Sequence, residues 1–411
     1  ISPANIDQYK ILLYELGFVD RTLCELKDFV SSNILKGPAA WELALWHADK
    51  YTAKDAKECL RFLDMVQKER YGSDKLIESY LLMSECHQSL GNLDSSWRVI
   101  NKALSIECRA DALLGAANLE NELRQRILWI NRVFRLYGLK TISFSSAEDI
   151  SPLDCLRSDT NGYMNQGGRG RQPKVTVIIS AYNAESTIAT ALTSLGSQTW
   201  QELEMLVVDD NSSDSTREVV HTFMQKDSRI GLISASKNQG PYVARNLALE
   251  EATGQFVTCH DADDWSHPQK IQLQVEHLMD NPSLVGNTSQ LSRVDPNLIF
   301  FRRGNPGQYI QVNMSSFMFK RKPVMERVGY WDSVRFGADG EFIRRIKKAF
   351  GQDKVAHLST GPLSFLRHTR NSLTGNNEFG YPGYFMGARK EYRDSYLNYH
   401  RKSHNLYIEF P

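Results

Sequence analysis

The spacing of apolar and polar residues changes twice along the chain. From about residue 6 to residue 139, apolar residues recur at three- and four-residue spacing and Gly and Pro are rare, which is typical of amphipathic helices. The composition then shifts to Ser, Asp, Asn and Gly, and β-rich runs alternating with helical stretches follow. The pattern predicts a helical domain over 1–144, a linker over 145–173, an α/β domain over 174–375 and a C-terminal helical extension over 376–411.

Two segments of the N-terminal region each predict a pair of helices joined by a turn. They cover residues 39–66 and 81–106, and Gly91 lies at the turn of the second pair. Both resemble tetratricopeptide-type hairpins, in which small residues pack where the two helices cross. A solenoid needs roughly three such repeats, so a plain helical bundle that caps the next domain is the alternative. In either form, we expect this region to be able to bind a protein partner.

Four β-rich runs open the α/β domain: "VTVIIS", "EMLVVDD", "RIGLISAS" and "GQFVTCHD". Strands that alternate with helices predict a mostly parallel, Rossmann-like sheet with helices on both faces. The strands of such a sheet are buried on both sides, which explains why these runs are continuously apolar. Because ligands bind at the carboxyl ends of parallel strands, the residues that follow each run are the candidates for chemistry.

Polar residues follow all four runs, so four consecutive strands direct polar groups to one edge of the sheet. Each group alone has a simple structural explanation, since "DDNSSD" is also a good turn and helix cap. The joint pattern nevertheless predicts a ligand site. The residues concerned are Ser180, Tyr182, Asn183 and Glu185 after the first run, Asp209 and Asp210 after the second, Gly240 and Arg245 after the third, and Asp261, Asp263 and Asp264 after the fourth.

The acidic cluster Asp261, Asp263 and Asp264 is the sharpest of these features. Crowding carboxylates after a buried strand is electrostatically costly unless a cation offsets their charge. Carboxylate oxygens select hard ions, and Mg²⁺ sites use one or two carboxylates together with substrate phosphates. The cluster therefore predicts a Mn²⁺ or Mg²⁺ site, with a solvated acidic turn as the alternative.

At this point the sequence resembles the family 2 glycosyltransferases, which have the GT-A fold. The segments "VTVIISAYNAE", "SQTWQELEMLVVDDNSSDST", "NQGPYVARNLAL" and "GQFVTCHDADDW" look like the successive signatures of that family, and the likeness extends over residues 174–374. The resemblance implies an inverting, metal-dependent enzyme that moves a sugar from a nucleotide-sugar, most commonly a UDP-sugar, to a hydroxyl group of a glycan or lipid-linked glycan. Synthesis of a bacterial surface polysaccharide such as O-antigen or capsule is the usual work of the family.

The resemblance also implies roles for individual residues. Ser180 and Tyr182 match positions that cradle the nucleotide base, and Asp210 matches the acid that hydrogen-bonds it. Asp261 and Asp263 match the DxD motif, in which the second Asp binds the metal and the first faces the ribose or the donor sugar. The whole expected donor-binding set is Ser180, Tyr182, Asn183, Glu185, Asp209, Asp210, Gly240, Arg245 and Asp261.

On the acceptor side, the segment "VGYWDSVRFGADGEFIRRI" resembles the part of the family that carries the catalytic base. An acidic pair commonly opens that helix, but here Ala338 replaces the first acid. Asp339 keeps the base position, and Glu341 is the second candidate. His368, in "LSFLRHTRNSLT", matches a position where many members place a further metal or phosphate ligand. Single acids and a lone His can also be ordinary helix or core residues.

Composition indicates which partners and which cellular compartment to expect. Lys+Arg 49 and Asp+Glu 48 give a net charge of +1, so we expect no nucleic-acid partner, because such binding needs a basic excess. The six cysteines form no CxxC pair, which favours a reducing, cytoplasmic compartment. No apolar run approaches the roughly 20 residues that span a bilayer, and from the pattern of the given sequence we expect no signal peptide. The chain begins at Ile1, so we expect it to be part of a longer protein.

The C-terminal stretch from Tyr384 to Tyr407 is rich in Tyr, Arg, Lys and His. Such a mixture suits peripheral contact with the anionic inner face of a membrane, whereas a helix packed on the catalytic domain with a solvated basic face is the alternative. Two other functions also compete with the main hypothesis. A sugar nucleotidyltransferase would need a Gly-rich basic loop after the first strand, where Asn183 and Glu185 stand instead. A scaffold with an inactive transferase domain would lack the acids that this sequence retains.

Overall fold

The computed structural model describes residues 6–33, 35–69, 71–145, 150–158, 172–368 and 387–410. These residues divide into two compact units. The described part of the helical unit comes from residues 1–136, 299–309 and Gly387, and that of the α/β unit from residues 137–298, 310–368 and 388–410. Most of the predicted linker and the start of the predicted C-terminal extension lie outside the described residues.

The helical unit is built from consecutive short helices, which confirms the predicted N-terminal helical region. Their bounds are α1 Ile6–Lys10, the π-helix η1 Ile11–Glu15, α2 Val19–Ser31, α3 Lys36–Ala48, α4 Ala53–Val66, α5 Ser73–Ser89, α6 Leu93–Ile106, α7 Ala110–Leu119 and α8 Leu123–Leu136. The unit also takes up residues 299–309, which carry the short strand β9 Phe300–Phe301 and which the sequence pattern placed in the α/β domain.

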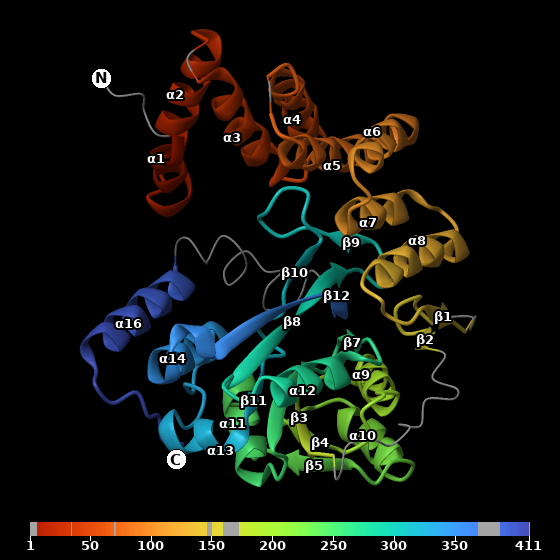
Figure 1. The fold of residues 1–411 in the computed structure, drawn as a ribbon, viewed down its shortest axis with the longest axis vertical. Coiled ribbons are helices and arrows are strands. Elements are labelled where there is room, and N and C mark those ends of the chain that lie inside the picture. The colour runs from red at the N-terminus through yellow and green to blue at the C-terminus, as the bar shows by residue number, and fades with distance from the viewer. Residues whose placement is uncertain are drawn as a thin grey trace. The chain divides into compact units, whose positions relative to one another are not determined.

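The helices pack as successive hairpins, α3 with α4, α5 with α6 and α7 with α8 (Figure 1). The first two pairs coincide with the hairpins expected at residues 39–66 and 81–106, and Gly91 forms the α5–α6 turn with a left-handed φ of 76°. At the crossing of α5 and α6, the hydroxyl groups of Ser84 and Ser96 lie 2.8 Å apart. Small residues thus allow the two helices to approach closely, and the tetratricopeptide-like character itself stays a prediction.

The α/β unit alternates strands and helices as the sequence pattern predicted. Its strands are β1 Ile142–Phe144, β2 Leu156–Ser158, β3 Val175–Ala181, β4 Leu203–Asp209, β5 Ile230–Ser234, β6 Phe256–Asp261, β7 Trp265–Ser266, β8 Gly286–Val294, β10 Ile310–Val312, β11 Met318–Lys320 and β12 Val355–Arg367. Its helices are α9 Ile188–Gly196, α10 Thr216–Met224, α11 Pro241–Glu251, α12 Lys270–Asp280, α13 Arg321–Arg327, α14 Ala338–Phe350, the 3₁₀ helix η2 Gln352–Lys354 and α16 Ala388–Lys402.

The main sheet has the strand order β5-β4-β3-β6-β11-β8-β12-β7. The first four strands pair in parallel, which matches the four β-rich runs of the sequence. Beyond β6 the sheet becomes mixed, because β11 runs antiparallel to both β6 and β8, and β12 pairs in parallel with β8. The parallel half therefore follows the predicted α/β pattern, and the mixed half extends the sheet on the side of β8 and β12.

Helices cover both faces of the sheet (Figure 1). On one face, α9, α10 and α12 pack on side chains such as Val177 and Ile179 of β3. On the other face, α11, α13 and α14 pack on Ile178 of the same strand. Because successive strand residues point to opposite faces, the largely apolar strand β3 contributes side chains to two hydrophobic cores, as the sequence pattern predicted.

The C-terminal helix α16 packs against α14 within the α/β unit. The His400 ring lies 2.8 Å from a carboxylate oxygen of Glu341, and the Tyr392 hydroxyl donates to Asp332 at 3.0 Å. After the helix, the backbone at Ile408 pairs with Gly329. Among the described residues, no helix has both the length and the apolar composition to cross a bilayer.

The buried His267 side chain predicts that the α/β unit loses stability in mild acid. Its Nε2 donates to the Lys140 carbonyl at 3.0 Å, and burial lowers its pKa from 6.5 to about 4. Between these pH values the unfolded chain binds a proton that the folded protein excludes, so acid favours unfolding. We expect the contribution of His267 to the free energy of unfolding to fall by about 3 kcal/mol as the pH drops from 6.5 to 4, since one pKa unit corresponds to about 1.4 kcal/mol. Burial also lowers the pKa of His260 to about 4, so this residue adds to the same slope.

Urea denaturation at a series of pH values measures this slope. His267→Gln should flatten it, and His404→Gln, at an exposed position, serves as the matched control whose profile should superimpose on that of the parent chain. An unchanged slope in His267→Gln would show that another group causes the acid sensitivity.

Candidate active site

The carboxyl ends of the parallel strands lie level with one another at one edge of the sheet. In the strand register, Ser180 of β3 pairs with Asp261 of β6, and Ala181 pairs with Asp209 of β4. Asp209 in turn pairs with Ser234 at the end of β5. The residues that follow these strands are thereby gathered at the edge where α/β sheets bind ligands.

The loops after β3 and β4 are fastened to each other by the side chains of Asn183 and Glu185. The carbonyl oxygen Oδ1 of Asn183 accepts a hydrogen bond from the Ser213 backbone at 2.9 Å, and Oε2 of Glu185 accepts one from the Ser215 backbone at 2.9 Å. Asn183 adopts a left-handed φ of 49°, which Asn tolerates better than most residues. These two predicted donor-binding residues thus shape the site by holding its loops, while Tyr182, which is 53% exposed, faces solvent.

Two neighbouring aspartates at the end of β4 have different surroundings. Asp209 is fully buried and pairs with Arg217 of α10 at 2.5 Å, so its carboxylate anchors the helix that follows. Asp210 turns toward the loop after β5, where its two oxygens accept hydrogen bonds from the backbone of Gln239 at 2.9 Å and Gly240 at 2.7 Å. Asp210 therefore fixes the turn that begins α11 at Gly240, which adopts a φ of 93°.

Arg245 connects the end of β6 with the first turn of α14. Its guanidinium donates through Nη2 to Asp261 at 3.0 Å and through Nη1 to Asp339 at 2.5 Å. The residue is only 3% exposed, and charge-assisted hydrogen bonds of this kind are strong when they are shielded from water. In the structure Arg245 lies between two carboxylates, and its expected contact with the nucleotide stays a prediction.

Asp339 has the surroundings of a general base. It lies in the first turn of α14, and the Tyr242 hydroxyl donates to its Oδ2 at 2.9 Å while Arg245 binds Oδ1. Burial raises the pKa of the Asp339 carboxyl, and the Arg245 charge opposes that shift. A carboxylate with fixed orientation and a raised pKa is suited to accept a proton from a substrate hydroxyl group.

Glu341, the second candidate base, does not lie with Asp339, Tyr242 and Arg245. Its side chain is nearly fully buried, Arg345 binds it at 2.7 Å, and the His400 ring lies 2.8 Å away. Hydrogen bonding from His400 and the charge of Arg345 hold the pKa of Glu341 below its usual range despite burial. The two acids differ because residues two apart on a helix project to opposite sides.

The acidic cluster after β6 is crowded and partly desolvated. Burial and the charge of Asp261 raise the pKa of Asp263 to about 6, and burial raises the pKa of Asp264 well above its usual range. The backbone of Arg367 donates to Asp264 at 3.0 Å. Of the three side chains, that of Asp264 is nearly fully buried, whereas that of Asp261 is 35% exposed.

These two carboxylates fit a divalent cation only in part. Within the described residues, no group of three or more His, Cys, Asp or Glu side chains is arranged to hold a metal ion. Mg²⁺ sites commonly combine one or two carboxylates with substrate phosphates, so a cation here would take its remaining ligands from a bound diphosphate. The His368 backbone donates to Val294 at 2.6 Å, and the expected ligand role of the His368 side chain stays a prediction.

The structure adds three residues that the sequence motifs did not single out. Tyr242 precedes Arg245 by three residues, so helical spacing could have placed both on the same face of α11. Arg293 of β8 lies within electrostatic reach of all three aspartates of the cluster. Arg389 of α16 lies within electrostatic reach of Tyr242 and Asp339. The last two stand outside any motif, and only tertiary structure brings them near the site.

Comparison with known proteins connects this site to a family. Residues 176–323 match the model of "Glycosyl transferase family 2". That segment carries Asp210, Arg245, Asp261 and Asp263, whereas Asp339 lies beyond its end. The family match therefore does not include Asp339 and its surroundings.

Three curated relatives are glycosyltransferases by name. The chain is 34% identical over 109 residues to an uncharacterized glycosyltransferase of Haemophilus influenzae. The aligned residues make up 26% of this chain and 44% of that protein. It is 38% identical over 109 residues to TuaG of Bacillus subtilis, a putative teichuronic acid biosynthesis glycosyltransferase, covering 26% and 43%.

The third relative is WfgD of Escherichia coli, named a UDP-Glc:α-D-GlcNAc-diphosphoundecaprenol β-1,3-glucosyltransferase, which is 40% identical over 107 residues, covering 26% of this chain and 42% of that protein. The chain thus spans less than half the length of each of these relatives. Among solved structures, S. aureus TarS residues 1–349 has a TM-score of 0.41 at 22% identity, covering 47% of this chain and 60% of that chain.

Proposed function

We propose that the chain transfers a sugar from a nucleotide-sugar donor to a hydroxyl group of a glycan acceptor during polysaccharide biosynthesis, on the premise that residues 176–323, which match the family 2 model, form a glycosyltransferase domain. The observation that supports the proposal most strongly is the Arg245 bridge. One guanidinium holds both Asp261 of the DxD segment and the candidate base Asp339, so the donor and acceptor halves of such a reaction would meet at this point.

We further propose a UDP-sugar as donor and a lipid-linked glycan as acceptor. The name of WfgD, which specifies a UDP-linked glucose and an acceptor carried on a diphosphate lipid, supports this choice. Asp261 and Asp263 would hold Mn²⁺ or Mg²⁺ together with the donor diphosphate. The bound cation would offset the negative charge that develops on the diphosphate as the glycosidic bond breaks.

The proposed mechanism is a single displacement with inversion at the anomeric carbon. The oxygen of the acceptor hydroxyl group attacks the anomeric carbon, and Asp339 accepts the proton of that hydroxyl group. The nucleoside diphosphate leaves from the opposite side of the carbon. Tyr242 and Arg245 hold the two carboxylate oxygens of Asp339, so the orientation of the base does not depend on the substrate. One base and direct displacement predict inversion, and in this proposal the neighbouring carboxylates of Asp261 and Asp263 hold the cation and the donor instead of attacking the sugar.

The experiment that tests this function is a screen of UDP-, dTDP-, GDP- and CMP-sugars, each with Mn²⁺, Mg²⁺ or EDTA. Thermal shift reports binding, and release of the nucleoside diphosphate reports turnover. We expect UDP-sugars to raise the melting temperature in the presence of metal and EDTA to abolish that effect, because the diphosphate and the two aspartates share one cation. Absence of a response to every nucleotide would refute the proposed function.

A further inference from the structure

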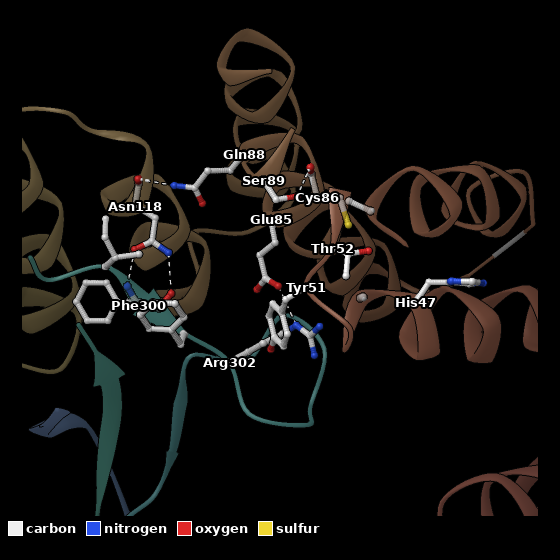
Figure 2. Close-up of a pocket in the computed structure, with 14 residues that line it drawn as sticks. His47, Tyr51, Thr52, Glu85, Cys86, Gln88, Ser89, Asn118, Phe300 and Arg302 are labelled. Atoms are coloured by element: carbon white, nitrogen blue, oxygen red, sulfur yellow. Dashed lines mark hydrogen bonds and ion pairs between the residues drawn. The ribbon is translucent and has the colours of Figure 1, made fainter. Parts of the chain in front are cut away.

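The helical unit contains a cavity of about 270 Å³ between α3, α4, α5, the end of α7 and the segment 299–302 (Figure 2). All of its lining residues belong to that unit. Its walls combine apolar surface with a few polar side chains, which is the usual composition of a ligand site. The residues that matter for the argument are Tyr51, Glu85, Asn118, Phe300 and Arg302.

Arg302 forms a buried polar wall of this cavity. Its side chain is 1% exposed, its Nε donates to Glu85 at 2.8 Å, and its Nη1 donates to Asp49 at 2.6 Å. The third nitrogen, Nη2, is buried and has no acceptor among the described residues. A buried donor without an acceptor costs free energy, so an acceptor atom would be favoured here once movement of a lining side chain lets a ligand reach this nitrogen.

The charges around Arg302 favour a neutral ligand. Because the guanidinium already lies between the carboxylates of Asp49 and Glu85, an incoming anion would meet two negative charges and only one positive charge. Glu85 also binds the Tyr309 side chain, and because a carboxylate offers about four acceptor sites, it keeps the capacity to accept one more hydrogen bond from a ligand. The matching ligand group both donates and accepts, as a hydroxyl group does.

Aromatic rings complete the cavity. Tyr51 is 65% exposed, has a left-handed φ of 51°, and its ring lies 5.6 Å from the Arg302 guanidinium (Figure 2). Exposed side chains change rotamer within nanoseconds, so this ring can move off the guanidinium and pack over a ligand. Phe300 is held in place because its backbone exchanges two hydrogen bonds with the Asn118 side chain, at 2.7 and 2.9 Å.

We propose that this cavity binds one neutral sugar residue of the glycan acceptor, at a site separate from the catalytic residues. The proposal rests on the proposed function. Adjacent hydroxyl groups of a sugar would accept from Arg302 and donate to Glu85, while the apolar face of the ring would pack on Tyr51. The volume of about 270 Å³ is below that of sites for drug-sized ligands, roughly 300–1,000 Å³, which suits a single ring rather than an oligosaccharide.

The test measures, by saturation-transfer NMR, the binding of methyl glycosides of glucose, galactose, mannose and N-acetylglucosamine to the intact chain. Tyr51→Asn removes the ring and keeps a residue that tolerates a left-handed φ, and we expect it to weaken binding of the preferred glycoside roughly tenfold. Ser89→Trp, at an exposed lining position, should fill the cavity and abolish the signal. Phe18→Asn, an exposed aromatic outside the cavity, is the control and should bind normally.

Ser89→Trp separates the two sites, because it fills the cavity and leaves the residues around Asp339 unchanged, and Asp339→Asn is measured in parallel. A glycoside signal that persists in Asp339→Asn and disappears in Ser89→Trp supports the cavity site. A signal that is unchanged in Ser89→Trp, or no signal with any glycoside, overturns it. The nucleotide screen reports independently on the proposed function, so a chain that binds glycosides in the cavity but responds to no nucleotide would refute only the transferase.

Discussion

Asp339→Asn is expected to abolish sugar transfer and to leave donor binding nearly intact. The substitution keeps the size and position of the side chain but removes the proton acceptor, and general-base catalysis contributes about 10²–10⁴-fold to rate. The nucleotide would still meet the loops around Asp210 and the acidic cluster, which Asp339 does not form. Initial rates with a soluble acceptor, together with nucleotide affinity by calorimetry, measure the two effects separately.

Glu341→Gln is the matched comparison, because it changes the other candidate base by the same single atom. Breaking a buried ion pair can cost 3–5 kcal/mol, so this variant should lose stability through its contacts with Arg345 and His400. The rate per folded molecule should stay near that of the parent chain. Near-normal turnover in Asp339→Asn combined with inactive, folded Glu341→Gln would reverse the assignment of the base.

Asp263→Asn is expected to remove the metal dependence of donor binding. Burial and the charge of Asp261 already raise the pKa of Asp263 to about 6, which indicates a carboxylate that a cation would stabilise. Loss of that ligand should weaken UDP binding in the presence of Mn²⁺ by roughly 100-fold, since a bound cation contributes several kcal/mol of charge stabilisation. Calorimetric titration with UDP, with Mn²⁺ and with EDTA, measures the difference.

The control is Asp353→Asn, an exposed aspartate of η2 whose side chain is 74% exposed. It removes the same charge from the protein surface, and its nucleotide affinity should equal that of the parent chain in both conditions. Equal Mn²⁺-dependent affinity in Asp263→Asn and Asp353→Asn would exclude Asp263 as a metal ligand.

Local sequence determined the elements of this protein because the signals involved are short-range. Continuous apolar runs identified β3, β4, β5 and β6, which are buried on both faces. The glycine at position 91 and the three- and four-residue periodicity identified the helical hairpins. The acids that follow the strands were visible for the same reason, since the register of a parallel sheet brings strand ends to one edge.

The tertiary structure decided what each of those side chains does. Asp209 and Asp210 are neighbours in sequence, yet one anchors Arg217 of α10 and the other fixes the turn at Gly240. Arg245 bridges two carboxylates that lie 78 positions apart, 261 and 339. No local pattern encodes such a partner, because the pairing depends on how α11, β6 and α14 pack together.

Tertiary packing, and not local sequence, also decided the different surroundings of the two candidate bases and the boundary between the two units. The sequence located Asp339 and Glu341 on one helix, and the packing of α14 sent the first toward Arg245 and the second toward His400. The pattern likewise assigned residues 299–309 to the α/β domain, whereas they join the helical unit, where Arg302 pairs with Asp49 and Glu85. Hydrophobic periodicity determined the elements, and long-range packing and charge pairing determined the site and the cavity.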